Sequence, residues 1–181
     1  MKAKSLTVVG FVMLLALLFS SCGEQQTTGV VVGITSEVDT VEKFDPFVEG
    51  NKNIIRKENE DIQLFIKRYG WNMHETGSGL YIEILEEGSG AYFVDGDEVT
   101  LDYQMQLLDG EKIYDSKTEG VKRFEVGKKE EMAGLHEAVK LLRRGGKARL
   151  VLPSYLAYGV AGDGRKIRGR KSVAMTIQVI N

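Results

Sequence analysis

The segment EVTLDYQMQLL, at residues 98–108, alternates apolar and polar side chains with a period of two. One face carries Val99, Leu101, Tyr103, Met105 and Leu107. Because successive side chains of a β-strand point to opposite faces, the pattern predicts a half-buried strand. The segment SVAMTIQVI, at residues 172–180, repeats the alternation and predicts a second strand of the same kind.

Shorter segments extend the predicted sheet. Asp109 and Gly110 supply a hairpin turn, after which KIYDS returns as a partner strand. LYIEIL, KRFEV and KARLVL predict further strands.

The segment EEMAGLHEAVKLLRRGG, between KRFEV and KARLVL, predicts an amphipathic helix. Leu135, Val139 and Leu142 lie on one helical face, and two glycines stop the helix. Arg143 and Arg144 occupy the helix end that favours cations. The expected fold is therefore α+β, with an antiparallel, twisted sheet of five to six strands wrapped around one amphipathic helix.

An N-terminal helical extension is expected over residues 53–79, ahead of the main domain at residues 80–181. Its apolar residues recur at helical spacing: Ile62, Phe65, Ile66 and Tyr69. This face can dock on the chain's own domain or pair two copies, and the short helix favours docking.

Residues 1–21 have the layout of a signal peptide, with Lys2 and Lys4 before an apolar run and small residues after it. The apolar run is shorter than the about 20 residues that a membrane-spanning helix needs, so cleavage is expected. The single cysteine, Cys22, ends the sequence LFSSC, which resembles the lipobox of bacterial lipoproteins. The alternative is a free cysteine beside an ordinary cleavage site. Residues 22–52 are expected to form a lipid-anchored flexible linker.

Charge argues against a nucleic-acid partner. The formal net charge is −2, and removal of residues 1–21 deletes two lysines and no acid, which moves it to −4. The basic segment RKIRGRK, at residues 165–171, is interpreted as a solvated loop in such a chain. His74 and His136 are the only histidines, which excludes a multi-histidine metal site, and both are expected at the surface. With one cysteine, no disulfide within the chain is possible.

The segment LPSYLAYG, at residues 152–159, places two tyrosines between a proline and a glycine. Pattern alone favours packing of this loop on the core. The order of VTLDYQMQLLDGEKIYDS, GLHEAV, LPSYLAYG and a final apolar strand resembles the FK506-binding-protein (FKBP) family of peptidyl-prolyl isomerases, across roughly residues 80–181. The helical lead-in and the lipobox make the chain similar to exported bacterial members.

The resemblance implies catalysis of cis/trans rotation about X-Pro bonds, without a cofactor or a metal. The obstacle is an amide rotation barrier of about 18–20 kcal/mol. A dry aromatic pocket disfavours the planar, polar amide relative to the twisted state. The implied partners are proline-containing polypeptides and macrolides of the FK506 type. The implied location is the bacterial cell envelope, facing the periplasm or the outer membrane, with the membrane reached through the lipid on Cys22.

The resemblance also implies residue roles. The Tyr158 hydroxyl and the backbone N–H of Met132 would donate to substrate carbonyls, and Asp115 would sit at the rim as a polar contact. The substrate-facing walls and floor would be formed by Tyr103, Tyr114, Phe124, Leu135 and Ile177. These inward-facing residues can equally be plain core when judged from the pattern alone.

The chain departs from the family pattern at three places. Leu135 replaces the usual tryptophan of the pocket floor, which should widen the pocket and weaken proline binding. The loop SKTEGVK is short and lacks the arginine that usually pairs with the pocket aspartate, so Lys122 or Arg123 is the candidate replacement. The segment GDGRKIRGRK replaces an Ile-Pro-Pro type turn and would bias the entrance toward acidic or extended polypeptides.

Three functions remain open on the sequence. The first is an active isomerase that assists the folding of exported proteins. The second is a chaperone-like or scaffolding module with a weakened pocket, which Leu135 and the basic segment favour. The third is a structural lipoprotein, favoured only by the tether.

Overall fold

The central strand β4 (Glu98–Leu107) organises a sheet in which every pairing is antiparallel. The protein is seen here as a computed structural model that describes residues 46–180. On one side β4 pairs with β9 (Val173–Val179), with Tyr103 opposite Ile177. On the other side it pairs with β5 (Lys112–Asp115) and β6 (Lys122–Glu125).

The sheet continues beyond β9 through β8 (Lys147–Leu152), β2 (Tyr81–Glu86) and β1 (His74–Glu75). Its order is β1-β2-β8-β9-β4-β5, with β6 beside β4. The predicted strands are thus confirmed, although the sheet has seven strands rather than five to six. The additional strand β1 is only two residues long.

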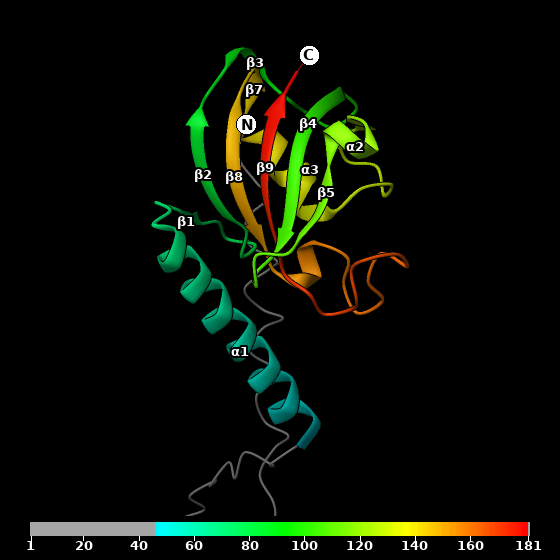
Figure 1. Cartoon of the computed structure of the whole chain (residues 1–181). Coiled ribbons are helices and arrows are strands. Elements are labelled where there is room, and N and C mark those ends of the chain that lie inside the picture. Colours follow the sequence, from blue (N-terminus) through cyan, green and yellow to red (C-terminus); the bar gives the residue numbers. More distant parts are fainter. Residues whose placement is uncertain (1–45, 181) are drawn as a thin grey trace, which may run out of the picture. The chain divides into compact units, whose positions relative to one another are not determined.

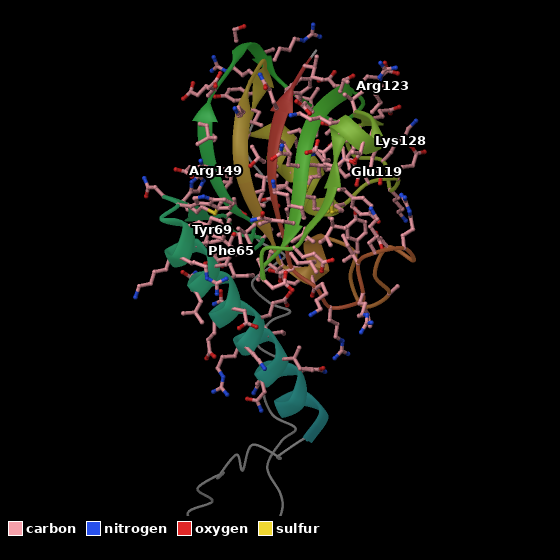
Figure 2. The ribbon with its side chains drawn as sticks, in the orientation of Figure 1. Phe65, Tyr69, Glu119, Arg123, Lys128 and Arg149 are labelled. Carbon is pink, nitrogen blue, oxygen red and sulfur yellow. The ribbon has the colours of Figure 1, made fainter. Side chains whose placement is uncertain are left out.

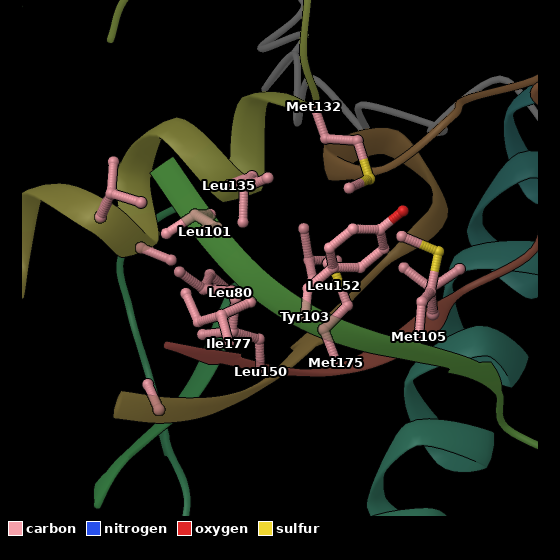
Figure 3. Packing of buried hydrophobic residues seen from close by; sticks show 14 of the residues in the cluster. Leu80, Leu101, Tyr103, Met105, Met132, Leu135, Leu150, Leu152, Met175 and Ile177 are labelled. Atoms are coloured by element: carbon pink, nitrogen blue, oxygen red, sulfur yellow. The ribbon is translucent and has the colours of Figure 1, made fainter. Parts of the chain in front are cut away.

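The core lies between one face of this sheet and helix α3 (Ala133–Lys140), which Figure 1 shows crossing that face. Alternate residues of β4 are buried, as the period of two predicts. Figure 3 shows Met132 and Leu135, at the start of α3, directed toward side chains of the sheet. The predicted α+β arrangement of one amphipathic helix on an antiparallel sheet is therefore confirmed.

The end of α3 differs from the sequence prediction. The helix ends at Lys140, and Arg143–Arg144 form the short strand β7, which pairs with β3 (Ser89–Tyr92). The Arg143 guanidinium lies 4.4 Å from the centre of the Tyr92 ring and donates to the Tyr92 hydroxyl. This cross-strand contact outweighs the weak preference of the arginines for a helix end.

The N-terminal helix α1 (Pro46–Tyr69) docks on the sheet through its last turns. Ile62 and Phe65, each 1% exposed, form an apolar cluster with Tyr81, Val151 and Ala174. Figure 2 shows Phe65 and Tyr69 at this end of α1. The expected docking is confirmed, and α1 begins at Pro46, so that residues 46–52 of the expected linker are helical.

The predicted signal peptide, Cys22 and the rest of the linker lie outside the described residues. Among residues 46–180, no helix is both long and apolar enough to cross a membrane.

Candidate functional site

Five side chains from five separate segments lie in the main core cluster or pack against it. We call them the aromatic site: Tyr103 of β4, Tyr114 of β5, Phe124 of β6, Met132 before α3, and Tyr158 of the loop after β8. The first four are 4% to 8% exposed, and Tyr158 is half-buried and packs against the cluster that contains them. The fold thus joins the tyrosine loop to the sheet residues that the sequence marked.

Leu135 and Ile177 belong to the same core cluster as the aromatic site. Their side chains are 0% and 1% exposed, so neither offers open surface to a ligand. Figure 3 shows Leu135 on the core side of α3 and Ile177 among the side chains of the sheet. The expected widening at Leu135 is therefore not seen, because its side chain is fully buried within the core cluster.

The Tyr158 hydroxyl is available as a hydrogen-bond donor. Within residues 46–180 it has no hydrogen-bond partner, in contrast to the nearby Tyr155 hydroxyl, which donates to the Ser78 carbonyl at 2.9 Å. Burial raises the pKa of Tyr158 well above its ordinary value, and the charges of Glu131 and Asp163 raise it further. Tyr158 consequently stays protonated at neutral pH and available to a ligand carbonyl.

Asp163, which the sequence analysis did not single out, holds one edge of the site. Its carboxylate accepts hydrogen bonds from the Tyr114 hydroxyl and from the backbone N–H groups of Arg165 and Ile167, the latter two at 2.9 and 2.8 Å. Burial opposes its ionisation, but these hydrogen bonds hold its pKa below the ordinary value. The Asp-Gly pair at residues 163–164 is a turn signal that could have identified this residue.

The basic segment at residues 165–171 was predicted to be a solvated loop, but its first two side chains make contacts with the rest of the domain. Arg165 pairs with Glu119 at 3.3 Å, and the Lys166 ammonium donates to the Ile113 carbonyl at 3.2 Å. Both cations also lie over the Tyr114 ring, at 5.3 and 5.0 Å from its centre. The first part of the segment therefore packs beside the aromatic site, although both side chains remain exposed.

Asp115 is half-buried and caps the short helix α2 (Ser116–Glu119). Its carboxylate accepts from the Lys117 backbone N–H at 2.9 Å. Neither candidate cation pairs with it: Arg123 is exposed, as Figure 2 shows, and Lys122 pairs with Glu131. The expected replacement of the missing arginine is thus wrong, because both cations lie on β6 and Lys122 faces the start of α3 instead.

A partly buried ion pair borders the aromatic site. The Lys122 ammonium lies 2.6 Å from a Glu131 carboxylate oxygen, and the two side chains are 21% and 13% exposed. The same ammonium lies 5.3 Å from the centre of the Tyr103 ring. The second Glu131 oxygen accepts from the backbone N–H of Met132 at 3.2 Å. The N–H proposed to hold a substrate carbonyl is therefore already engaged.

His74 is exposed, as expected, whereas His136 is half-buried. Its Nδ1 atom accepts from the Gly127 backbone N–H at 3.2 Å, and its ring packs edge-on against Phe124. It supports the turn between β6 and α3. Over residues 46–180, no cluster of three or more potential metal-ligating side chains is present.

Comparisons with known proteins identify the main domain. Residues 90–180, half of the chain, match the family described as FKBP-type peptidyl-prolyl cis-trans isomerase. The chain is 29% identical over 135 residues to the probable FKBP-type peptidyl-prolyl cis-trans isomerase FkpA of Neisseria meningitidis, covering 74% of this chain and 49% of that protein. It is 33% identical over 106 residues to FkpA of Escherichia coli, covering 59% and 38%. The chain thus spans about half the length, or less, of these curated relatives.

Solved structures agree in fold. The crystal structure of FkpA from Escherichia coli superposes with a TM-score of 0.61 at 26% identity, covering 75% of this chain and 63% of that chain. The crystal structure of AtFKBP13 gives a TM-score of 0.56 at 26% identity, covering 61% and 98%. The matched segment contains every residue of the aromatic site. The chain belongs to the FKBP-type peptidyl-prolyl cis-trans isomerase family.

Proposed function

We propose that this protein is a peptidyl-prolyl cis-trans isomerase that acts on X-Pro bonds of exported polypeptides to assist their folding. The observation that carries the proposal is the Tyr158 hydroxyl, a protonated donor without a partner among residues 46–180, held against an apolar, aromatic surface. Family membership supports the same reaction.

The proposed chemistry needs no nucleophile. Proline would lie against Tyr103, Phe124 and Met132, where water is largely excluded. A site of low polarity favours the twisted amide, whose resonance is broken, over the planar one. The Tyr158 hydroxyl would donate to one substrate carbonyl and the Met132 N–H to another, which orients the peptide on both sides of the rotating bond.

Asp115 and the buried residues have supporting roles in this proposal. Asp115 would contact the peptide at the rim, through the carboxylate oxygen that does not cap α2. Tyr114 would form a wall whose position is fixed by its bond to Asp163. Leu135 and Ile177 would support the floor from beneath. Macrolides of the FK506 type would compete for the same surface.

The test compares Tyr158→Phe with Tyr155→Phe in an isomerisation assay on a series of short X-Pro peptides. Loss of one neutral hydrogen bond, about 0.5–1.5 kcal/mol, predicts a fall in kcat/KM of up to about tenfold for Tyr158→Phe. Tyr155→Phe is the matched control, because the Tyr155 hydroxyl is already bonded to Ser78. Equal effects of the two substitutions would contradict the assigned role.

A second candidate function is a binding module of the same fold with little isomerase activity. The bond between Glu131 and the Met132 N–H favours it, since a substrate must displace a charged acceptor. A folded protein that binds proline peptides but does not accelerate their isomerisation would support this candidate.

We also propose that Cys22 becomes lipidated after signal-peptide removal and tethers the domain to a membrane of the cell envelope. The support is the order of charged, apolar and small residues that ends in LFSSC. Stable anchoring needs more than one acyl chain.

A further inference from the structure

Glu58 of α1 reaches the loop that carries Tyr158. Its Oε1 atom accepts from the Ser154 backbone N–H at 2.6 Å and from the Ser172 hydroxyl at 2.6 Å. Both serines are buried, and Glu58 is half-buried. One carboxylate oxygen thus joins segments that are 96 and 114 residues away in the sequence.

Ser154 and Ser172 mark the two ends of the loop that carries Tyr158, and we call them the loop stems. Ser154 opens the 3-10 turn η1 (Ser154–Leu156) just after β8, and Ser172 directly precedes β9. Strands β8 and β9 are neighbours in the sheet, with Leu152 opposite Val173. Glu58 therefore binds at the point where the loop leaves the sheet and returns to it.

Backbone hydrogen bonds lead from Ser154 to the neighbours of Tyr158. The Ser154 carbonyl accepts from the Ala157 N–H at 3.1 Å and from the Gly159 N–H at 2.7 Å. The Gly159 carbonyl in turn accepts from the Arg170 N–H at 2.7 Å. The residues on both sides of Tyr158 are thus tied to the stem that Glu58 holds.

Helix α1 has a docking contact that does not depend on Glu58. Ile62 and Phe65 are buried in the apolar cluster against the sheet, and Asn59 accepts from the Tyr81 hydroxyl at 2.8 Å. Removal of the Glu58 carboxylate should therefore release the loop stems while the helix stays in place.

We propose that Glu58 is a positioning residue for Tyr158. Helix α1 thereby contributes to the geometry of the isomerase site. The inference rests on the proposed function. Without the carboxylate, the buried Ser154 N–H and Ser172 hydroxyl lose their acceptor and must move to find another. Displacement of a substrate-holding group by about 1 Å can remove its interaction with the substrate. For the Tyr158 hydroxyl that interaction corresponds to at most about tenfold in rate.

The test compares Glu58→Ala, Glu58→Gln and the control Glu60→Ala in the full protein. Glu58→Ala should lower kcat by up to about tenfold, no more than the loss expected from removal of the Tyr158 hydroxyl itself. Glu58→Gln keeps a carbonyl oxygen for both donors and should retain kcat within about threefold. Glu60 is exposed on the same helix, with only a 3.9 Å contact to Arg56, and its removal should change nothing. A Gln variant as impaired as the Ala variant would contradict the hydrogen-bond basis.

A double variant separates positioning from general destabilisation. If Glu58 acts through Tyr158, then Tyr158→Phe should add little to the loss already caused by Glu58→Ala. Fully additive losses, or a Glu58→Ala variant with unchanged kcat, would overturn the proposal. Ser172→Ala removes one of the two bonds and should give a smaller loss of the same kind, which provides a test even if Glu58→Ala folds poorly.

Amide hydrogen exchange tests the proposal independently of activity. Glu58→Ala should speed exchange at the Gly159 and Arg170 amides and leave the strand β9 amides unchanged. If the wild type does not accelerate isomerisation, the proposed function fails and this exchange measurement alone decides the role of Glu58. Unchanged exchange at both loop amides would refute it.

Discussion

Replacement of the ion pair beside the aromatic site by apolar residues, in the variant Lys122→Met/Glu131→Leu, should tighten substrate binding. The substitution frees the Met132 N–H from its 3.2 Å bond to Glu131, so that a substrate carbonyl no longer competes with a carboxylate. A long bond of this kind contributes about 1 kcal/mol, which corresponds to about a fivefold lower KM. The bond competes with the substrate in the ground state and the transition state alike, so kcat should stay unchanged.

Stability should survive this change. The pair is 21% and 13% exposed, and exchange of such buried pairs for apolar residues is often neutral or stabilising. Glu131→Leu alone should instead destabilise by about 1–3 kcal/mol, because it leaves the Lys122 ammonium unpaired apart from its contact with the Tyr103 ring. Urea denaturation measures both effects.

The matched control for the double variant is Glu125→Leu/Lys128→Met. This pair has the same 2.6 Å separation, but its side chains are 35% and 55% exposed, and the Met132 N–H is bonded to Glu131 instead. Its removal should leave KM unchanged and stability within about 0.5 kcal/mol. An unchanged or higher KM in Lys122→Met/Glu131→Leu, with stability retained, would refute the view that Glu131 competes with substrate.

Two further predictions concern pH and the tether. Because the pKa of Asp163 is lowered in the folded state, its contribution to stability is present above about pH 4 and is lost as the pH falls below that value. Asp163→Asn should therefore make the acid side of a plot of unfolding free energy against pH less steep. An unchanged slope would contradict the hydrogen bonds that Asp163 accepts from Tyr114 and from the loop. Cys22→Ser should abolish incorporation of labelled fatty acid and shift the expressed protein from the membrane to the soluble fraction, whereas retained label would show that another residue is acylated.

Sequence alone predicted the parts of the fold that repeat regularly. The alternation in β4 is strict, and β9 follows it except at Ala174, which is also buried. The structure pairs Tyr103 with Ile177 on the shared buried face. The predicted end of α3 was wrong. Arg143 suits a helix C-terminus locally, but in the fold it contacts Tyr92, 51 residues away in the sequence. Long-range pairing of this kind leaves no periodic trace in the sequence.

For the candidate site too, some features could be predicted from the sequence and others could not. Tyr103, Tyr114, Phe124, Met132 and Tyr158 were marked through the family resemblance, and the structure brings them together. The polar contacts around these five residues were not predicted: Asp163 with Tyr114, Lys122 with Glu131, and Glu58 with Ser154 and Ser172. Each joins residues by side-chain geometry that depends on the completed fold.

The most direct test of the central claim is exchange NMR of an X-Pro peptide with a small, substoichiometric amount of the wild-type protein. Uncatalysed isomerisation takes tens to hundreds of seconds, so its exchange peaks are absent on a mixing time of about one second. The account predicts that cis–trans exchange peaks emerge with the wild type and weaken with Tyr158→Phe. Absence of these peaks with a folded wild-type protein and every peptide tried would contradict the isomerase assignment.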